Sequence, residues 1–195
     1  MSNWDVNRVV GTETRKSYKS KIESGFLDKY LSGENILEIG NGSSDTIVPN
    51  AIGVDKGYPG YDNLILPFAD QSQDAVYSSH CLEHIDDYKT ALLDWFRVLK
   101  VGGYMIIAVP HFQLYEKKKE IPSRWNPDHK RFYHPITLLE EIYEALPFGE
   151  WRLRHCIEND DGFDYTLPCD VHSKGAYEIE VVIQKIERFA YIDKI

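Results

Sequence analysis

A short apolar run that ends in glycines constrains the fold of this 195-residue chain more than any other feature. Ile36 to Ile39 are predicted to form a buried strand, and Gly40 and Gly42 follow it almost directly. Nucleotide-binding loops of α/β proteins begin in this way, with a strand that leads into a glycine-rich turn. The pattern predicts a ligand at this point: a dinucleotide, a nucleoside triphosphate or a nucleoside without phosphates. An ordinary tight turn is the alternative.

Two of these ligands conflict with the residues that follow the glycines. A triphosphate loop needs a lysine followed by Ser or Thr, but Gly42 is followed by SSDTIVPN, which has no lysine. A dinucleotide loop needs a third glycine and a helix N-terminus, whereas Asp45 stands at that position and Pro49 leaves little room for a helix. A nucleoside without phosphates remains. Asp55, at the end of the next apolar run, is predicted to accept hydrogen bonds from its ribose.

The rest of the chain alternates between predicted helices and predicted strands. The predicted helices are 18–31, 86–100 and 135–146, and the predicted strands are 36–39, 51–55, 63–66, 74–79, 104–110, 151–158 and 177–186. This alternation predicts an α/β fold with a mostly parallel seven-stranded sheet, an antiparallel terminal strand and shortened connections between the first and third strands. We expect one domain over residues 1–195, with an N-terminal helical segment at 1–34.

Composition narrows the class of protein. The net charge of −9 argues against a nucleic-acid partner, because such proteins normally present a basic surface. No apolar run approaches the ~20 residues of a membrane span, and the N-terminus is too polar for a signal peptide. The three cysteines are far apart and indicate neither a disulfide framework nor a CxxC metal site. We therefore expect a reduced, cytoplasmic protein.

A series of motifs between Ile36 and Pro110 points to one family. In chain order they are LEIGNG, GVD, LPF, DxSxDxV, LEH and RVLKxGG. Together they resemble the methyltransferase type 11 group of the class I S-adenosylmethionine-dependent methyltransferases. The resemblance implies a Rossmann-like fold and S-adenosyl-L-methionine as the cofactor. This cofactor is a nucleoside that carries a sulfonium and an ammonium group, which suits the acidic rim of the predicted sheet.

The resemblance also implies a set of cofactor-binding residues. They are Glu38, Gly40, Asn41, Gly42, Ser43, Asp55, Lys56, Asp62, Asn63, Leu66, Ser79 and His80. The first five would lie at the methionine end, with Glu38 accepting from the ammonium group, and Asp55 and Lys56 would lie at the ribose. One departure from the family is that only about eight residues separate Gly42 from the next strand. The helices usually found there must be short or missing, which predicts a more open pocket near the adenine.

The long connection at 111–135 is predicted to be an acceptor-binding lid, because polar and aromatic residues outnumber periodic apolar ones there. The candidate catalytic bases, in order of preference, are His111, His129 and His134. The candidate substrate-binding residues are Arg124, Trp125, Asp128, Arg131 and Tyr133. Two plainer roles stay open, with His134 as a helix cap and Asp128 paired with Arg131 to fix the loop.

The sequence thus predicts a methyltransferase that O-methylates a hydroxyl of a small molecule or of a sugar or glycan. One alternative is C- or N-methylation of a small metabolite, and another is a non-catalytic module that binds cofactor or a partner. The acidic stretch at 158–165 is interpreted as a solvated turn, and no set of His and carboxylate ligands occurs at a reliable spacing. No metal is therefore expected.

Overall fold

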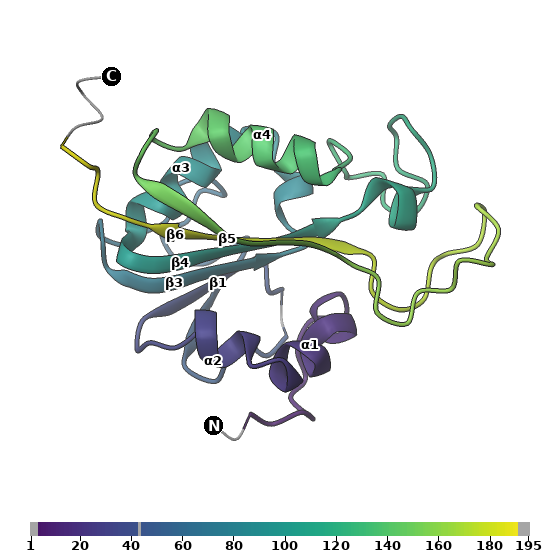
Figure 1. The fold of residues 1–195 in the computed structure, drawn as a ribbon, viewed down its shortest axis with the longest axis horizontal. Coiled ribbons are helices and arrows are strands. Elements are labelled where there is room, and N and C mark those ends of the chain that lie inside the picture. The colour runs from purple at the N-terminus through teal and green to yellow at the C-terminus, as the bar shows by residue number, and fades with distance from the viewer. Residues whose placement is uncertain (1–3, 43, 191–195) are drawn as a thin grey trace.

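The computed structural model describes residues 4–42 and 44–190, which form a six-stranded sheet with helices on both faces (Figure 1). The helices are α1 (Thr14–Glu23), α2 (Phe26–Tyr30), α3 (Tyr88–Val98) and α4 (Pro135–Ala145), and two short helical turns are η1 (Leu82–His84) and η2 (Phe112–Glu116). The strands are β1 (Ile36–Ile39), β2 (Ala51–Val54), β3 (Gln73–Ser79), β4 (Leu99–Pro110), β5 (Trp151–Asn159) and β6 (Glu178–Lys185). In the described part of the chain, no helix has the length and apolar character needed to cross a bilayer.

The strand order β2-β1-β3-β4-β6-β5 confirms the predicted mixed sheet. The pairs β1–β2, β1–β3 and β3–β4 are parallel, whereas β6 is antiparallel to both β4 and β5. Helices cover both faces of the sheet, and strands β1, β3 and β4 supply most of its buried residues. The carboxyl ends of β1 to β4 therefore meet at one edge, where ligands of such sheets bind.

The seventh strand, expected at 63–66, does not form. Asn63 has a left-handed backbone (φ 76°), which ends any extended run there. The N–H groups of Leu64 and Ile65 donate to the side chain of Asp62, and the N–H of Leu66 donates to the buried Asp94. A strand needs these N–H groups for a neighbouring strand, so the side-chain bonds replace the ladder. The sheet has six strands in the described residues.

The expected shortening between the first and third strands is confirmed. Among the described residues between β1 and β3, no helix covers the sheet. The connection from β1 to β2 is anchored instead by Ile47 and Val48, which are fully buried against α1 and α2. This part of the sheet edge is consequently covered by loops, and the cavity described below lies among them.

Local signals set the ends of the helices. The Asp87 side chain accepts a hydrogen bond from Thr90 N and caps α3, as its sequence predicts. The single helix expected at 18–31 is two helices, because Gly25 adopts a left-handed backbone (φ 72°) between α1 and α2. Glycine takes this conformation without the strain that a Cβ would add.

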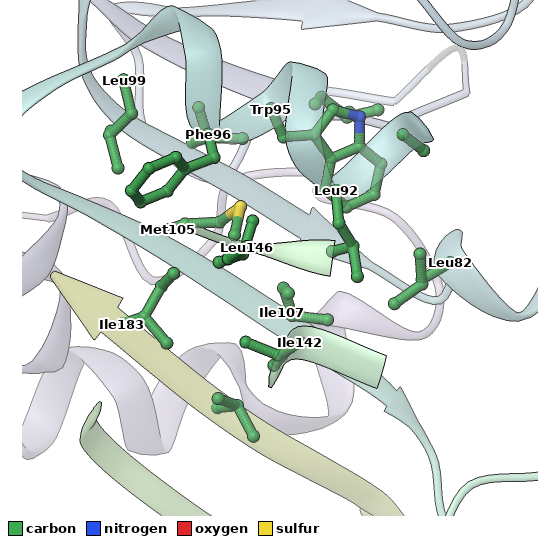
Figure 2. Packing of buried hydrophobic residues seen from close by; sticks show 14 of the residues in the cluster. Leu82, Leu92, Trp95, Phe96, Leu99, Met105, Ile107, Ile142, Leu146 and Ile183 are labelled. Atoms are coloured by element: carbon green, nitrogen blue, oxygen red, sulfur yellow. The ribbon is translucent and has the colours of Figure 1, made fainter. Parts of the chain in front are cut away.

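The core lies mainly between the sheet and the pair α3 and α4 (Figure 2). Leu92, Trp95 and Phe96 of α3 are buried against Met105 and Ile107 of β4. Burying each such side chain stabilises the fold by about 1.5–3 kcal/mol. A second cluster on the opposite face packs α1 and α2 against the sheet.

Candidate active site

A cavity of about 350 Å³ opens at the carboxyl ends of β1 and β2. It is lined by Ile39, Gly40, Val54, Asp55, Lys56, Tyr61, Asp62, Asn63, Leu64, Cys81, His84, Ile85, Asp86 and Asp87. Its size is that of a small-molecule site, and it combines an apolar wall with a few convergent polar groups. Five of the predicted cofactor residues line it: Gly40, Asp55, Lys56, Asp62 and Asn63.

The glycine loop is shaped by its two glycines and by Asp55. Gly40 has a φ of 81°, and a Cβ at this position would lie 2.6 Å from Cys81 Cβ. Gly42 (φ 61°) donates its N–H to Asp55 Oδ2 at 2.6 Å, and Lys56 donates its N–H to Asp55 Oδ1 at 2.6 Å. A carboxylate offers about four lone-pair sites. Asp55 therefore keeps capacity for two ligand hydroxyls while it orders the loop.

Asp62 and Asn63 form a tight turn at the wall of the cavity. Asp62 Oδ1 accepts from Ile65 N at 2.7 Å and from Leu64 N at 3.0 Å, and these bonds lower the pKa of the Asp62 carboxyl. The apolar side chains of Ile39, Val54 and Leu64 line the same cavity. A flat heterocycle with an exocyclic amino group would find both an apolar wall and an acceptor here.

Other predicted cofactor residues do not line the cavity. Asn41 folds back, with its amide donating to Ser44 O and its side chain lying over Gly53. Leu66 is a core residue, and Ser79 is buried at the end of β3. Ser43 lies outside the described residues.

Glu38 is also turned away from the cavity. It is buried, and its carboxylate accepts a hydrogen bond from Ile47 N, which ties the glycine loop to the body of the fold. Burial raises the pKa of Glu38 to about 7. The sequence predicts that Glu38 accepts from the ligand's ammonium group, whereas here its partner is the backbone.

The three candidate bases occupy different surroundings. His111 is buried, its Nδ1 accepts from Gln113 N, and its Nε2 lies 3.7 Å from Glu158 Oε2. Burial lowers the pKa of His111. His134 caps α4 by accepting from Ile136 N, which is the plainer of its two expected roles. His129 is buried 4.8 Å, ring to ring, from His84, which lines the cavity.

Most predicted substrate residues hold the 111–135 segment in place. Tyr133 is buried in the main core and donates to Glu141, so it offers no stacking surface. Arg131 donates to Ile85 O and pairs with Glu141 at 3.3 Å, and the expected Asp128–Arg131 pair is not formed. Asp128 instead lies 3.2 Å from His84 Nδ1 and from Lys130 Nζ.

Two residues of this segment remain closer to the surface. The indole of Trp125 donates to Tyr115 O at 2.8 Å, which fixes its half-buried ring, and Arg124 is exposed. The 111–135 segment therefore packs against the body of the protein and exposes polar side chains to solvent.

Sequence reasoning missed several residues of the site. Tyr61, Cys81 and Ile85 line the cavity, and burial raises the pKa of the Cys81 thiol to about 12, so that it stays neutral. Tyr61 stands directly beside Asp62 in the chain, and Cys81 and Ile85 flank the LEH motif, so their places in the chain were a signal. Glu83 belongs to the LEH motif, whereas Glu116 had no signal in the sequence, and both are fully buried next to histidines.

Comparison with known proteins gives partial matches in sequence and a full match in fold. Residues 61–107 match the model of the methyltransferase domain family. The O-methyltransferase resE of Aspergillus sclerotiorum is 33% identical over 117 residues, which are 59% of this chain and 42% of that protein. The demethylmenaquinone methyltransferase of Thermobifida fusca is 50% identical over 46 residues, which are 24% of this chain and 20% of that protein.

This chain thus spans about two fifths, or less, of the length of these curated relatives. Among solved structures, a SAM-dependent methyltransferase from Aquifex aeolicus superposes with a TM-score of 0.58 at 12% identity, covering 90% of this chain and 94% of that one. An identity of 12% shows a similar fold and nothing about the substrate. The matched segment and the shared fold indicate S-adenosylmethionine as the cofactor, and the chain has the fold of the class I S-adenosylmethionine-dependent methyltransferases.

Proposed function

We propose that this protein transfers the methyl group of S-adenosylmethionine to a hydroxyl of a small molecule or glycan. The observation that carries the proposal is the cavity at the ends of β1 and β2, where the Asp55 carboxylate faces a glycine loop. We further propose that residues 1–195 act as one domain in the cytoplasm, without a nucleic-acid partner.

Different residues of the cavity and of the glycine loop would contact different parts of the cofactor. Asp55 would accept hydrogen bonds from both ribose hydroxyls, and Gly40 and Gly42 would let the methionine part pass close to the backbone. Asp62 and Asn63 would meet the adenine, against the apolar wall. Asp55, Asp62, Asp86 and Asp87 make this rim acidic, which supports a cationic ligand and disfavours a phosphate.

Methyl transfer to a hydroxyl is an in-line displacement. The acceptor oxygen loses its proton and bonds to the methyl carbon, while the carbon–sulfur bond breaks and leaves neutral S-adenosylhomocysteine. Holding the two reactants in line can lower the activation free energy by ~7–11 kcal/mol. Proximity to the cavity supports His129 ahead of His111 as the group that removes the proton, since His129 contacts the cavity residue His84.

The names of the relatives support two kinds of acceptor. The relative from Aspergillus sclerotiorum is called an O-methyltransferase, in line with a hydroxyl acceptor. The relative from Thermobifida fusca is named for demethylmenaquinone, which keeps methylation of a non-sugar metabolite as the second candidate. The half-buried Trp125 and the exposed Arg124 are the lid residues that support a sugar.

Calorimetry with four ligands tests the cofactor. S-Adenosylmethionine and S-adenosylhomocysteine should bind with one site per chain, and NAD and ATP should bind far more weakly. Tighter binding of NAD would contradict the argument from Asp45 and from the acidic rim. Release of S-adenosylhomocysteine in the presence of a panel of sugars, nucleotide-sugars and quinols would then identify the acceptor. Binding without any turnover across the panel would favour the non-catalytic module.

A further inference from the structure

Glu83 is a buried carboxylate without a hydrogen bond. Its side chain is fully buried in η1, and no described residue donates a hydrogen bond to Oε1 or Oε2. Buried charges in proteins are normally paired, hydrogen-bonded or bound to a metal. Packing alone therefore gives no reason for a glutamate at this position.

Nitrogens of three histidines lie within 4 Å of the Glu83 carboxylate. Oε1 lies 3.8 Å from His84 Nε2, 3.9 Å from His129 Nε2 and 3.8 Å from His80 Nδ1. The ligand atoms of Glu83, His84 and His129 all lie within 4.8 Å of one another. Two ligands of a tetrahedral ion at ~2.1 Å are about 3.4 Å apart. Binding an ion would therefore bring Glu83 Oε1 a few tenths of an ångström closer to each histidine nitrogen and the two histidine nitrogens closer by up to about 1.4 Å.

Each of these histidines has a carboxylate at its other ring nitrogen. Glu116 Oε1 lies 2.6 Å from His129 Nδ1, and Glu116 is itself fixed by Ser123 Oγ at 2.5 Å. Asp128 Oδ2 lies 3.2 Å from His84 Nδ1, and Glu178 Oε2 lies 3.4 Å from His80 Nε2. Metal-binding histidines characteristically donate their second N–H to a carboxylate, which orients the ring and leaves the other nitrogen as a lone pair for the ion.

The fold brings these groups together from distant parts of the chain. Glu83 and His84 lie just beyond the carboxyl end of β3, and His129 belongs to the 111–135 segment. A backbone hydrogen bond from Lys130 N to Glu83 O, 2.8 Å long, joins the two segments. His84 also lines the cofactor cavity, so the cluster adjoins that cavity.

We propose that Glu83, His84 and His129 bind a divalent transition-metal ion and leave its fourth position open. Imidazole-rich sites with one carboxylate favour Zn²⁺ or Fe²⁺ over the hard cations Mg²⁺ and Ca²⁺. The proposal reverses the expectation from sequence that no metal is present. That expectation considered the acidic stretch at 158–165, which lies elsewhere in the chain.

The role of the ion rests on the proposed function. A metal beside the cavity would take the part proposed above for His129, which as a ligand has no free nitrogen for a proton. The ion would bind the acceptor hydroxyl and lower its pKa, so that the proton leaves to solvent before the oxygen bonds to the methyl carbon. The metal is neither oxidised nor reduced, and the sulfur leaves with the bonding electron pair. Such a site explains why a buried acid and several histidines gather beside the cavity.

Calorimetric titration of the chelator-treated full chain with Zn²⁺ and with Mg²⁺ tests the site directly. Wild type should bind one Zn²⁺ per chain, and Mg²⁺ at least 100-fold more weakly. Glu83→Gln and His129→Gln should lose at least 100-fold in Zn²⁺ affinity, and Glu116→Gln about 10- to 100-fold, as for other groups that orient a ligand. His155→Gln, on β5 and outside the cluster, is the matched control and should bind Zn²⁺ as wild type does.

Thermal unfolding separates metal binding from a purely structural role. Without metal, Glu83→Gln should unfold at the same or a higher temperature, because the variant removes a buried carboxylate that has no hydrogen bond. Zn²⁺ should raise the unfolding temperature of wild type and leave that of Glu83→Gln unchanged. A structural ion pair between Glu83 and charged histidines predicts the opposite, a less stable metal-free variant.

Three results would overturn the proposal: a wild type that binds no Zn²⁺, equal affinities for Zn²⁺ and Mg²⁺, or wild-type Zn²⁺ affinity in Glu83→Gln. All titrations are done without S-adenosylmethionine. Failure of the metal site is thus distinguishable from failure of the proposed methyl transfer, which the cofactor titration reports on its own.

Discussion

Replacing Lys21 with methionine should destabilise the fold strongly, because this lysine forms ion pairs with two buried glutamates. Lys21 extends from α1, and its Nζ lies 2.8 Å from Glu178 Oε1 and 2.7 Å from Glu180 Oε2. All three side chains are 3% exposed or less. Burial acts to lower the pKa of Lys21, but the charges of the two glutamates raise it well above its usual range.

The magnitude follows from what the two carboxylates must do once the cation is gone. Removing one partner of a buried ion pair costs about 3–5 kcal/mol of unfolding free energy. The carboxylates can limit this loss by taking up a proton. From an ordinary pKa of 4.5, protonating one glutamate costs about 3.4 kcal/mol at pH 7 but only about 0.7 kcal/mol at pH 5, at 1.36 kcal/mol per pH unit.

The loss of unfolding free energy in Lys21→Met should therefore be larger at pH 7 than at pH 5. Burial acts to raise the pKa of Glu178, but Lys21 and His80 hold it well below its usual range. A depressed folded-state pKa contributes stability above pH 4.5, and this contribution disappears as the pH falls further. The difference between wild type and Lys21→Met should thus be largest near pH 7 and should shrink toward pH 5.

Urea unfolding at pH 7 and pH 5 measures both quantities. Lys19→Met is the matched control on the same helix, since Lys19 and Glu23 form a 3.6 Å pair whose side chains are 72% and 64% exposed. An exposed pair of this kind contributes about 0–1 kcal/mol. Equal losses for the two variants, or a Lys21→Met loss that is the same at both pH values, would refute the reasoning.

Two further predictions concern the cofactor cavity. Asp55→Asn should weaken S-adenosylmethionine binding about 10- to 150-fold in calorimetry, because hydrogen bonds to a charged group contribute about 1.5–3 kcal/mol. Turnover at saturating cofactor should change little. The control Asp70→Asn, at an exposed position outside the cavity, should bind the cofactor as wild type does. Unchanged affinity in Asp55→Asn would remove Asp55 from the ribose site. Gly40→Ala should lower both cofactor affinity and unfolding free energy, the latter by about 1–3 kcal/mol, because its Cβ would lie 2.6 Å from Cys81 Cβ at a φ of 81°. Gly42→Ala meets no atom within 4 Å, so thermal unfolding should show a smaller loss, and equal losses would contradict this account.

Features that depend on near neighbours in the chain were predictable. The apolar run before Gly40 and the cap at Asp87 each follow from chemistry within a few residues. The alternating pattern near the C-terminus predicted two half-exposed strands, but β6 lies inside the sheet between β4 and β5 and is buried almost throughout. The prediction failed where a distant side chain changed a local preference. The run at 63–66 has the composition of a strand, but Asp94 of α3 binds the N–H of Leu66.

The cavity at the ends of β1 and β2 was predicted in part for the same reason. Gly40, Asp55 and Asp62 follow strand ends or turns and were identified from the motifs, and they do line the cavity. His111 was ranked first as a base because it directly follows β4. Its side chain, however, is buried beside Glu158 and contacts Phe112 and His134, and no pattern in the sequence reports the direction of a single side chain.

By itself, the sequence determined the α/β class, the parallel sheet and the glycine loop with Asp55, because periodicity and turn chemistry are local properties of the chain. Only the tertiary structure decided which polar groups meet. Glu83 and His84 lie more than thirty residues before Glu116 and His129, at irregular spacing. Packing of the 111–135 segment and the bond from Lys130 N to Glu83 O bring them together. A buried carboxylate with histidine nitrogens around it is a property of that packing, since burial and distance exist only once the chain has folded.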